Sequence, residues 1–331
     1  MSSELQKEPK VFVIVDGHAL IYRAYHAFPA LTDPKGRLVN AVYGFTRILL
    51  TAIQELKPEY LCVAFDSKGP TKRASELYDQ YKAQRAPMPD DLIPQIVLVK
   101  DVVDALNIPR YELSGFEADD LIGTVSKRVS AGNGVLDGVA APEGVRTIVV
   151  TGDKDLLQLV DDKIHVWLPG RGKGNLDEEL DEPAVQKKMG VLPTQVIDLK
   201  ALMGDSSDNI PGVKGVGPKT AIMLINQYQT LDGVYQEVER LSTATPAQLK
   251  AEVLSPKLLE KLVTDKKMAY LSRELATIDR EVPIEFLLAP CRIAQYNKQK
   301  TMDLFTELNF NSLQYLLPKD DFELGVQKAL F

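Results

Sequence analysis

The sequence predicts an α/β fold with a mainly parallel central sheet flanked by helices, and two observations support this prediction. Three continuous apolar runs have the length and the β-branched content of strands that are buried on both faces: Val11–Val15, Tyr60–Phe65 and Val145–Val150. Helical patterns lie between them, at Ala41–Leu56 and Pro94–Leu106. Such an alternation of buried strands and helices is typical of a parallel sheet.

The second part of the chain has a different character. Beyond about residue 195 the apolar β-type runs stop, and five helical patterns follow: Gln195–Met203, Pro218–Tyr228, Leu231–Leu241, Pro256–Leu271 and Lys300–Leu308. Two stretches rich in glycine, 130–144 and 168–175, are predicted to be loops. We therefore expect an α/β core over residues 1–195 and a helical region over residues 196–331.

Composition narrows the class of protein. The chain has 331 residues, 45% of them hydrophobic, which is enough for a sizeable core. It contains no apolar run of about 18 residues, and its first ten residues lack the apolar core of a signal peptide, so we expect a cytoplasmic protein without a membrane segment. The net charge of −7 argues against binding nucleic acid, unless many of the acids surround bound cations.

Each of the three apolar runs leads into an aspartate, namely Asp16, Asp66 and Asp153. The carboxyl ends of parallel strands meet at one edge of a sheet, where ligands bind in α/β folds, so these three acids should converge. Neighbouring carboxylates repel one another unless cations lie between them. Further acids that could join them are Glu117, Asp119, Asp120, Asp155, Asp205 and Asp208.

This set of acids favours a particular chemistry, although a helix cap or a solvated surface charge is the simpler interpretation of any one of them. Oxygen ligands without histidine or cysteine favour Mg²⁺ or Mn²⁺ over Zn²⁺. The acids outnumber what one ion needs, which suggests two ions. Two ions can stabilise both the attacking and the leaving oxygen of a phosphodiester, so the sequence predicts metal-dependent phosphate chemistry.

A glycine-rich hairpin at residues 210–221 is a second candidate site. Its glycines allow close backbone approach, and a proline opens the helix that follows, whose first amides can receive a phosphate. The spacing does not match a Walker loop, which leaves a nucleotide pocket or a plain helix packing joint as alternatives. We expect a clamp on a DNA backbone, formed by Gly212, Lys214, Gly215, Gly217, Lys219 and Thr220.

A basic stretch follows Asp66. It carries Lys68, Lys72, Arg73, Lys82 and Arg85, with Tyr78 and Tyr81 interleaved. Alternating cations and aromatic rings suit a single strand, whose phosphates meet the charges and whose bases stack on the rings. The alternative is a solvated amphipathic helix with its tyrosines in the core. Arg23 and its flanking tyrosines add similar chemistry seven residues beyond Asp16.

These segments, in this order, resemble the flap endonuclease/5′-exonuclease family, and most closely the 5′-nuclease domains of bacterial DNA polymerase I. The matching segments are Val15–His18, Phe65–Asp66, Tyr81–Lys82 with Arg85, Gly115–Asp120, Thr151–Asp155, Gly204–Gly212 and the hairpin. The resemblance implies a PIN-like 5′-nuclease fold with a helical arch at about residues 68–95 and a helix-hairpin-helix motif at about residues 205–225.

The resemblance also assigns roles to residues. Asp16, Asp66, Glu117 and Asp119 would hold one Mg²⁺ or Mn²⁺, and Asp153, Asp155, Asp205 and Asp208 would surround a second, with Asp120 close by. Arg23, Arg73, Lys82 and Arg85 would contact the scissile phosphate or the 5′ strand. Tyr81 and the hairpin would bind DNA, and K⁺ would bind at the hairpin. Water would be the nucleophile, so no covalent intermediate is required.

The implied function is a structure-specific 5′-nuclease acting on 5′ flaps and 5′ ends of branched, nicked or duplex DNA in primer removal and repair. The implied protein is a bacterial, nucleoid-associated monomer working with a DNA polymerase in cis or in trans. Two alternatives remain at this stage. A non-catalytic branched-DNA binding module would gain nothing from acids that repel phosphates. A related RNase or phosphatase is less consistent with the hairpin and the basic stretch.

Overall fold

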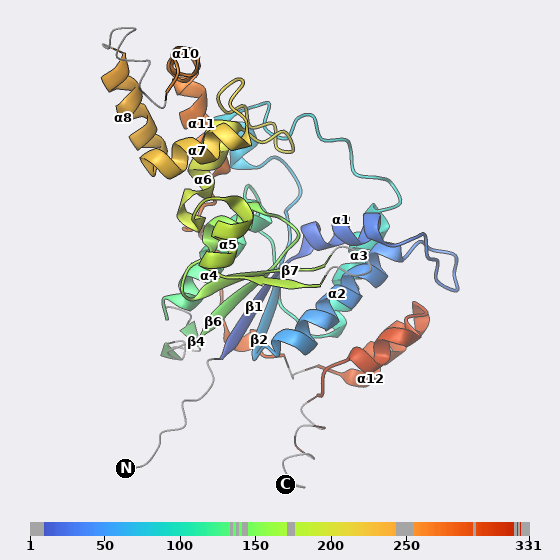
Figure 1. Ribbon diagram of the computed structural model, residues 1–331. Helices are drawn as coiled ribbons and strands as arrows, with labels where there is room; N and C mark the ends of the chain where they lie inside the picture. Colours follow the sequence, from blue (N-terminus) through green and yellow to red (C-terminus); the bar gives the residue numbers. More distant parts are fainter. Residues whose placement is uncertain are drawn as a thin grey trace, which may run out of the picture.

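The protein is described here by a computed structural model that covers residues 10–132, 135–136, 139–140, 145–170, 176–242, 254–293, 296–320, 323 and 325. A six-stranded sheet lies at its centre, with the strand order β3-β2-β1-β6-β7-β8 (Figure 1). Its strands are β1 (Val11–Asp16), β2 (Tyr60–Ala64), β3 (Arg110–Tyr111), β6 (Arg146–Val150), β7 (Ile164–Leu168) and β8 (Glu178–Leu180). Neighbouring strands are parallel except for β7 and β8.

The three apolar runs of the sequence form the middle of this sheet, as predicted. β1 pairs with β2 on one side and with β6 on the other. All residues of β2 are buried, and so are all but the first residue of β1 and of β6. Strands buried on both faces favour continuous apolar sequence over alternation, which is why the runs were visible in the sequence.

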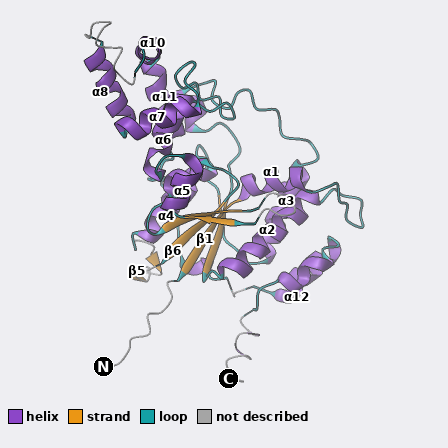
Figure 2. Cartoon of the chain, viewed as in Figure 1, coloured by secondary structure: helices purple, strands orange, loops and turns teal. Residues whose placement is uncertain are grey.

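Alternate residues of β1 enter two separate cores. Val13 and Val15 pack on the side of α1 (Gly17–Ala27), α2 (Asn40–Leu56), α3 (Ile93–Ala105) and α12 (Lys298–Glu307). Phe12 and Ile14 pack on the side of α4 (Ala118–Ser130). Helices therefore cover both faces of the sheet, as Figure 2 shows. The predicted α/β fold class is confirmed.

Beyond β8 the chain is helical in the residues that the structure describes. The helices are α5 (Glu182–Met189), α6 (Val196–Met203), α7 (Pro218–Tyr228), α8 (Leu231–Leu241), α10 (Pro256–Thr264) and α11 (Lys266–Ala276). The prediction of one helix over Pro256–Leu271 is wrong. The chain bends at Asp265, whose backbone is not helical and whose side chain accepts a hydrogen bond from another segment, the amide of Lys214.

Shorter elements connect these parts: the π-helical turn η1 (Arg73–Leu77), the 3₁₀ turns η2 (Asp155–Leu159), η3 (Pro193–Gln195), η4 (Ala289–Cys291) and η5 (Asn311–Leu316), and an antiparallel pair, β4 (Val135–Leu136) with β5 (Val139–Ala140). The predicted loop at 130–144 thus contains a short strand pair, and residues 171–175 of the other predicted loop lie outside the described residues.

The segment at 68–95, expected to be a helical arch, contains less helix than expected. Between its start and α3 it forms η1 and then turns, which run toward α3 as an extended connection (Figure 1). Lys82 has a positive φ of 56°, which a continuous right-handed helix does not allow. No described helix is both long and apolar enough to cross a membrane. The boundary predicted near residue 195 stays a prediction.

Candidate active site at the carboxyl edge of the sheet

Asp16 lies at the end of β1, with 3% of its surface exposed. One carboxylate oxygen accepts a hydrogen bond from the amide of Ala19 at 3.0 Å, which caps α1. The other accepts from the Thr151 hydroxyl at 2.8 Å. Thr151 follows β6, and its hydroxyl also accepts from the amide of Asp153 at 2.9 Å. The ends of two neighbouring strands are therefore tied together through one threonine.

Asp66 follows β2 and faces the start of α4. Its carboxylate accepts from the amide of Ala118 at 2.8 Å, and its own amide donates to Nδ1 of His18 at 2.9 Å. Glu117 is the N-cap of α4, and its amide donates to Asp120, so these two acids form a capping box. The local structure thus fixes the backbone of Asp66 and of Glu117 beside the end of β1.

Repulsion among these acids is visible in their pKa values. Burial raises the pKa of Asp16 to about 7, and the charges of Asp66 and Asp153 add to the rise. Burial also raises the pKa of Asp119 well above its usual range, with Asp16 and Asp153 adding to it. Each of these carboxylates therefore lies close enough to another to destabilise its charged form.

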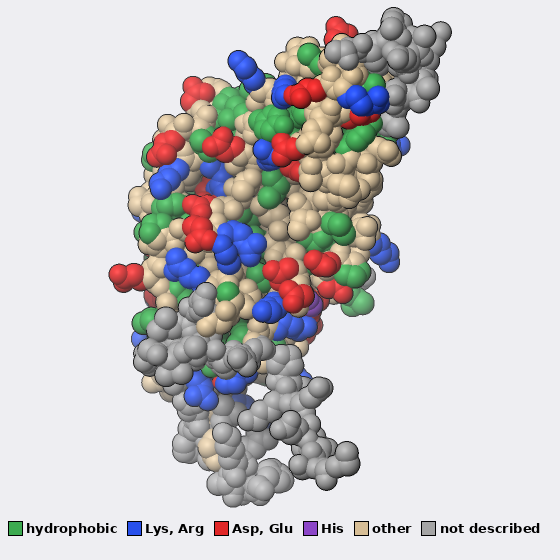
Figure 3. All heavy atoms as spheres, turned by 90° about the vertical axis from the view of Figure 1, so that its left-hand side faces the viewer, with side chains coloured by type: hydrophobic (Ala, Val, Ile, Leu, Met, Phe, Trp, Pro, Cys, Tyr) green, Lys and Arg blue, Asp and Glu red, His purple; other side chains and the backbone are tan. Residues whose placement is uncertain are grey.

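The donor set fits a hard divalent cation, because its side chains are carboxylates that lack enough positive charge, buried at Asp16, half-buried at Asp119 and Asp153, and exposed at Asp66. As arranged, however, the described residues do not include three or more His, Cys, Asp or Glu side chains that converge closely enough to hold an ion. Lysine and arginine alternate with acids over the face shown in Figure 3.

Asp155 and Asp205 form a second group around Lys200. The Lys200 ammonium, whose side chain is 5% exposed, pairs with Asp155 and lies 2.6 Å from Oδ2 of Asp205. Burial raises the pKa of Asp155 to about 7, Asp153 adds to the rise, and Lys200 opposes it. Burial acts to raise the pKa of Asp205 as well, but hydrogen bonds from Lys200 and Ser207 lower it overall.

Sequence reasoning missed Lys200. Its signal was a single cation in an otherwise largely apolar helix, α6, that leads directly into the acids of the 205–209 loop. Its ammonium takes part of the charge compensation that the sequence assigned to a metal ion.

The basic stretch meets these acids through Lys82 and Arg85. The ammonium of Lys82 lies 2.8 Å from Oε1 of Glu117 and 3.7 Å from Asp208. The guanidinium of Arg85 lies 2.5 Å from Oδ1 of Asp208. The Tyr81 hydroxyl donates to Glu117 at 3.1 Å and to Asp208 at 3.3 Å. Three side chains that the sequence singled out are therefore brought to the acids, on the side of the 205–209 loop.

Backbone and amide contacts hold the same stretch on that loop. The amide of Lys82 donates to the carbonyl of Asp208 at 2.9 Å, and the side chain of Asn209 donates to the carbonyl of Gln80 at 2.7 Å. Gln84 donates to the carbonyl of Ser206 at 2.9 Å. The arch segment is thus anchored to the helical region at residues 80–85.

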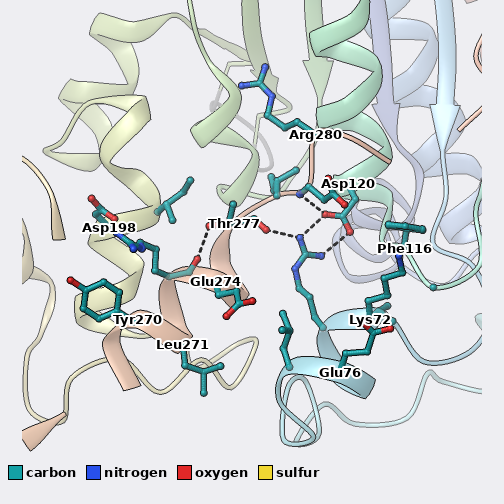
Figure 4. Close-up of a pocket in the computed structure, with 18 of the residues that line it drawn as sticks. Lys72, Glu76, Phe116, Asp120, Asp198, Tyr270, Leu271, Glu274, Thr277 and Arg280 are labelled. Atoms are coloured by element: carbon teal, nitrogen blue, oxygen red, sulfur yellow. Dashed lines mark hydrogen bonds and ion pairs between the residues drawn. The ribbon is translucent and has the colours of Figure 1, made fainter. Parts of the chain in front are cut away.

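Arg73 and Arg23 form hydrogen bonds with other groups of the protein. Arg73 is 8% exposed, and its guanidinium contacts both oxygens of Asp120, Glu117 at 3.0 Å and the carbonyl of Thr277 at 2.8 Å. Arg73 and Asp120 line a cavity of about 1060 Å³ between η1, α6 and α11, and Figure 4 shows Asp120 and Thr277 on its wall. Arg23 donates to the carbonyls of Pro169 and Gly170. Asp120 thus faces Arg73, and the roles predicted for these three residues stay predictions.

The hairpin lies at the start of α7, at the top of the molecule in Figure 1. Gly212 and Gly215 have φ values of 60° and 75°, which side chains with a Cβ disfavour. A Cβ at Gly212 would lie 2.3 Å from the amide nitrogen of Gly204, so these two segments of the backbone approach closely there. Pro218 is the first residue of α7, as predicted. The side chains of Lys214 and Lys219 are exposed beside it.

Sequence comparison identifies the two parts of the chain. Residues 11–190 match the family described as "5'-3' exonuclease, N-terminal resolvase-like domain", and residues 191–299 match "5'-3' exonuclease, C-terminal SAM fold". DNA polymerase I of Bacillus subtilis (strain 168) is 39% identical over 324 residues, which cover 98% of this chain and 34% of the relative. DNA polymerase I of Chloroflexus aurantiacus is 40% identical over 93% of this chain and 30% of the relative. The chain spans about a third of the length of these relatives.

Solved structures support the fold. T5 5'-exonuclease with bound zinc superposes with a TM-score of 0.60 at 19% identity, covering 91% of this chain and 99% of that one. The catalytic core of Rad2 in complex with DNA substrate superposes with a TM-score of 0.54 at 18% identity, covering 94% and 93%. Together with the two matched domains, these findings confirm the resemblance drawn from the motifs. The chain belongs to the 5′-3′ exonuclease family.

Proposed function

We propose that this protein is a divalent-metal-dependent 5′-nuclease that hydrolyses DNA phosphodiesters at 5′ ends and flap junctions. The observation that carries the proposal is the group of mutually repelling carboxylates at the carboxyl edge of the sheet, buried at Asp16 and half-buried at Asp119, with the cations of Lys82 and Arg85 beside it. Burying such acids without compensation is unfavourable, so the arrangement is explained by a ligand that supplies positive charge. A non-catalytic DNA-binding module would not need it.

The acids divide into two proposed ion sites. Asp16, Asp66, Glu117 and Asp119 would hold one Mg²⁺ or Mn²⁺, and Asp153, Asp155, Asp205 and Asp208 would surround the second, with Asp120 nearby. Lys200 would share Asp155 and Asp205 with that second ion. When bound, such ions activate water and neutralise charge on the phosphate and on the leaving oxygen.

The chain's own residues have separate tasks in this proposal. Lys82 and Arg85 would exchange Glu117 and Asp208 for the scissile phosphate and neutralise the charge that develops on it. Thr151 holds the carboxylate of Asp16 in one orientation. Tyr81 keeps Glu117 and Asp208 oriented and would lie beside the DNA strand. Arg73 holds the start of α4, and Arg23 fixes the loop after β7 near the site.

The hairpin would bind the DNA duplex at a distance from the carboxylates where hydrolysis takes place. The amides at the start of α7, with Lys214, Lys219 and Thr220, would contact phosphates of the duplex, and K⁺ would bind at Gly212, Gly215 and Gly217. Similar solved structures include, by their titles, a T5 flap endonuclease with DNA and metal ions and Rad2 with a DNA substrate. The similarity to DNA polymerase I supports a function beside a polymerase in primer removal and repair. The protein would act as a monomer in the bacterial cytoplasm.

The test is a cleavage assay on a 5′-flap DNA labelled at its 5′ end, with Mg²⁺ and with EDTA. Release of a short oligonucleotide cut near the junction, only with Mg²⁺, is the expected result. A matched single strand and a blunt duplex of the same sequence serve as controls for structure specificity. Binding to the flap without cleavage in Mg²⁺ or in Mn²⁺ would support the non-catalytic module instead.

A further inference from the structure

The backbone of the hairpin is held by side chains from a distant part of the chain. Lys261 in α10, Asp265 between α10 and α11, and Ser272 in α11 each make a hydrogen bond to it. The hairpin groups that they contact are the carbonyl of Gly215 and the amides of Lys214 and Gly212. Three hydrogen bonds from α10, α11 and the bend between them to residues 212–215 suggest that these side chains have a shared role.

Asp265 is the first of these side chains. It occupies the N-cap position of α11, where an aspartate commonly accepts a hydrogen bond from an amide of its own helix. Its side chain makes no such cap here. It accepts instead from the amide of Lys214 at 2.8 Å. The bend between α10 and α11 therefore directs a carboxylate to the hairpin.

Ser272 fixes the root of the hairpin. It is fully buried, its hydroxyl donates to the carbonyl of Met268 at 2.7 Å, and its oxygen accepts from the amide of Gly212 at 2.9 Å. Gly212 is the residue whose backbone lies against Gly204. The serine hydroxyl thus donates to its own helix and accepts from the hairpin, which ties the Gly212 amide to α11.

Lys261 fixes the turn itself. Its ammonium donates to the carbonyl of Gly215 at 2.8 Å. A Cβ at Gly215 would lie 2.6 Å from that ammonium, so a side chain there would displace the lysine from its present position. A Cβ at Gly217, by contrast, would meet nothing within 4 Å. The hairpin is therefore held from the side of α10 and α11 and open next to the start of α7.

We propose that Lys261, Asp265 and Ser272 are positioning residues for DNA binding: they hold the hairpin in its binding shape before DNA arrives. A loop that is already ordered loses little entropy on binding, so these contacts raise affinity without touching DNA. The proposal rests on the proposed function, in which the hairpin contacts phosphates of the duplex. It separates the hairpin lysines, which are exposed, from Lys261, whose ammonium donates to the Gly215 carbonyl.

Asp265 allows the cleanest test. Asp265→Ala removes the acceptor for the Lys214 amide, and Asp265→Asn keeps an oxygen acceptor in nearly the same place. In EDTA, fluorescence anisotropy with a labelled nicked duplex should give a dissociation constant about tenfold higher for the alanine variant, the effect of losing one hydrogen bond. The asparagine variant should bind nearly as the wild type does. Both variants should keep the wild-type circular dichroism spectrum and unfold cooperatively, with at most a small decrease in Tm for the alanine variant.

A double-mutant cycle shows whether Asp265 acts through the hairpin. The second change is Lys214→Ala with Lys219→Ala, which removes the exposed cations. If Asp265 acts by positioning the hairpin, Asp265→Ala adds little to the weakening that the lysine changes cause. Asp265→Ala alone should also reduce the dependence of DNA affinity on salt concentration, because a displaced hairpin no longer brings Lys214 and Lys219 to the phosphates.

The outcomes separate two failures. Full additivity, wild-type binding by Asp265→Ala, or an asparagine variant as weak as the alanine variant would overturn the positioning role while leaving the hairpin as the DNA interface. Wild-type binding by the lysine variant would overturn that part of the proposed function itself, and the inference would fall with it.

Discussion

The carboxyl edge of the sheet and the glycine hairpin are built in opposite ways. At the sheet edge, buried carboxylates raise one another's pKa and are only partly balanced by Lys82 and Lys200. At the hairpin, backbone groups are neutral and hydrogen-bonded, and the cations are exposed. The first region is poised to take up positive charge, and the second is shaped to receive negative charge. Changes at the two regions should therefore separate turnover from DNA binding.

The largest effect is expected from Asp16→Asn at the sheet edge. The substitution keeps the shape of a buried side chain but removes the charge that would hold an ion. We expect kcat on flap DNA to fall roughly 10³-fold, the effect of losing about 4 kcal/mol of transition-state stabilisation. Binding in EDTA should stay the same or tighten, because one charge that repels phosphates is gone. Loss of binding in parallel with loss of cleavage would contradict the assignment.

A smaller effect is expected when Lys82 and Arg85 are both replaced by alanine. Their charges lie beside Glu117 and Asp208, where the phosphate would be held. Single-turnover cleavage should slow about 10²-fold, as when one preorganised donor is removed from a reaction centre. The matched variant Lys82→Arg with Arg85→Lys keeps both charges and should recover much of the rate. A rate equal to that of the wild type in the alanine variant would remove these residues from the mechanism.

Thr151→Val tests the contact between two strand ends. The valine methyl can neither donate to Asp16 nor accept from the amide of Asp153. Since a partner of a metal ligand typically contributes about 10- to 100-fold in metal affinity or activity, we expect a higher Mg²⁺ requirement and a lower kcat. Thr151→Ser should restore both. An unchanged Mg²⁺ dependence in the valine variant would show that Asp16 does not need this support.

The smallest effect, on binding alone, is expected from Lys214→Ala with Lys219→Ala. Because this variant lacks two cations that would each neutralise a phosphate, the slope of log Kd against log salt should fall by about 1.8, and affinity at moderate salt should weaken about tenfold. The kcat at saturating flap DNA should not change, because no described contact joins either lysine side chain to the carboxylates of the site. A fall in kcat without a change in Kd would contradict the division between the two regions.

Local patterns explain what the sequence predicted correctly. Continuous apolar runs define strands buried on both faces, and the aspartate after each run necessarily lies at the same sheet edge. Pro218 and its preceding glycines define the start of α7 from neighbouring residues alone. In each case the information lies within a few positions of the chain.

Long-range contacts explain what it missed. Lys200 lies 45 residues from Asp155 in the sequence, and the residues around Lys200 do not indicate that Asp155 is its partner. The contacts of Arg73 with Asp120 and of Arg23 with two loop carbonyls likewise join segments far apart in the sequence, while the roles predicted for both arginines stay predictions. The bend at Asp265 depends on the Lys214 amide, and the turns of the arch segment depend on the 205–209 loop.

The central claim is that the carboxylates at the sheet edge form an incomplete site that divalent cations complete. Isothermal titration of Mn²⁺ into the protein without DNA, comparing the wild type with Asp16→Asn, tests it most directly. We predict saturable Mn²⁺ binding by the wild type and loss of at least one site in the variant. Absence of Mn²⁺ binding by the wild type, or identical binding by both proteins, would contradict the claim.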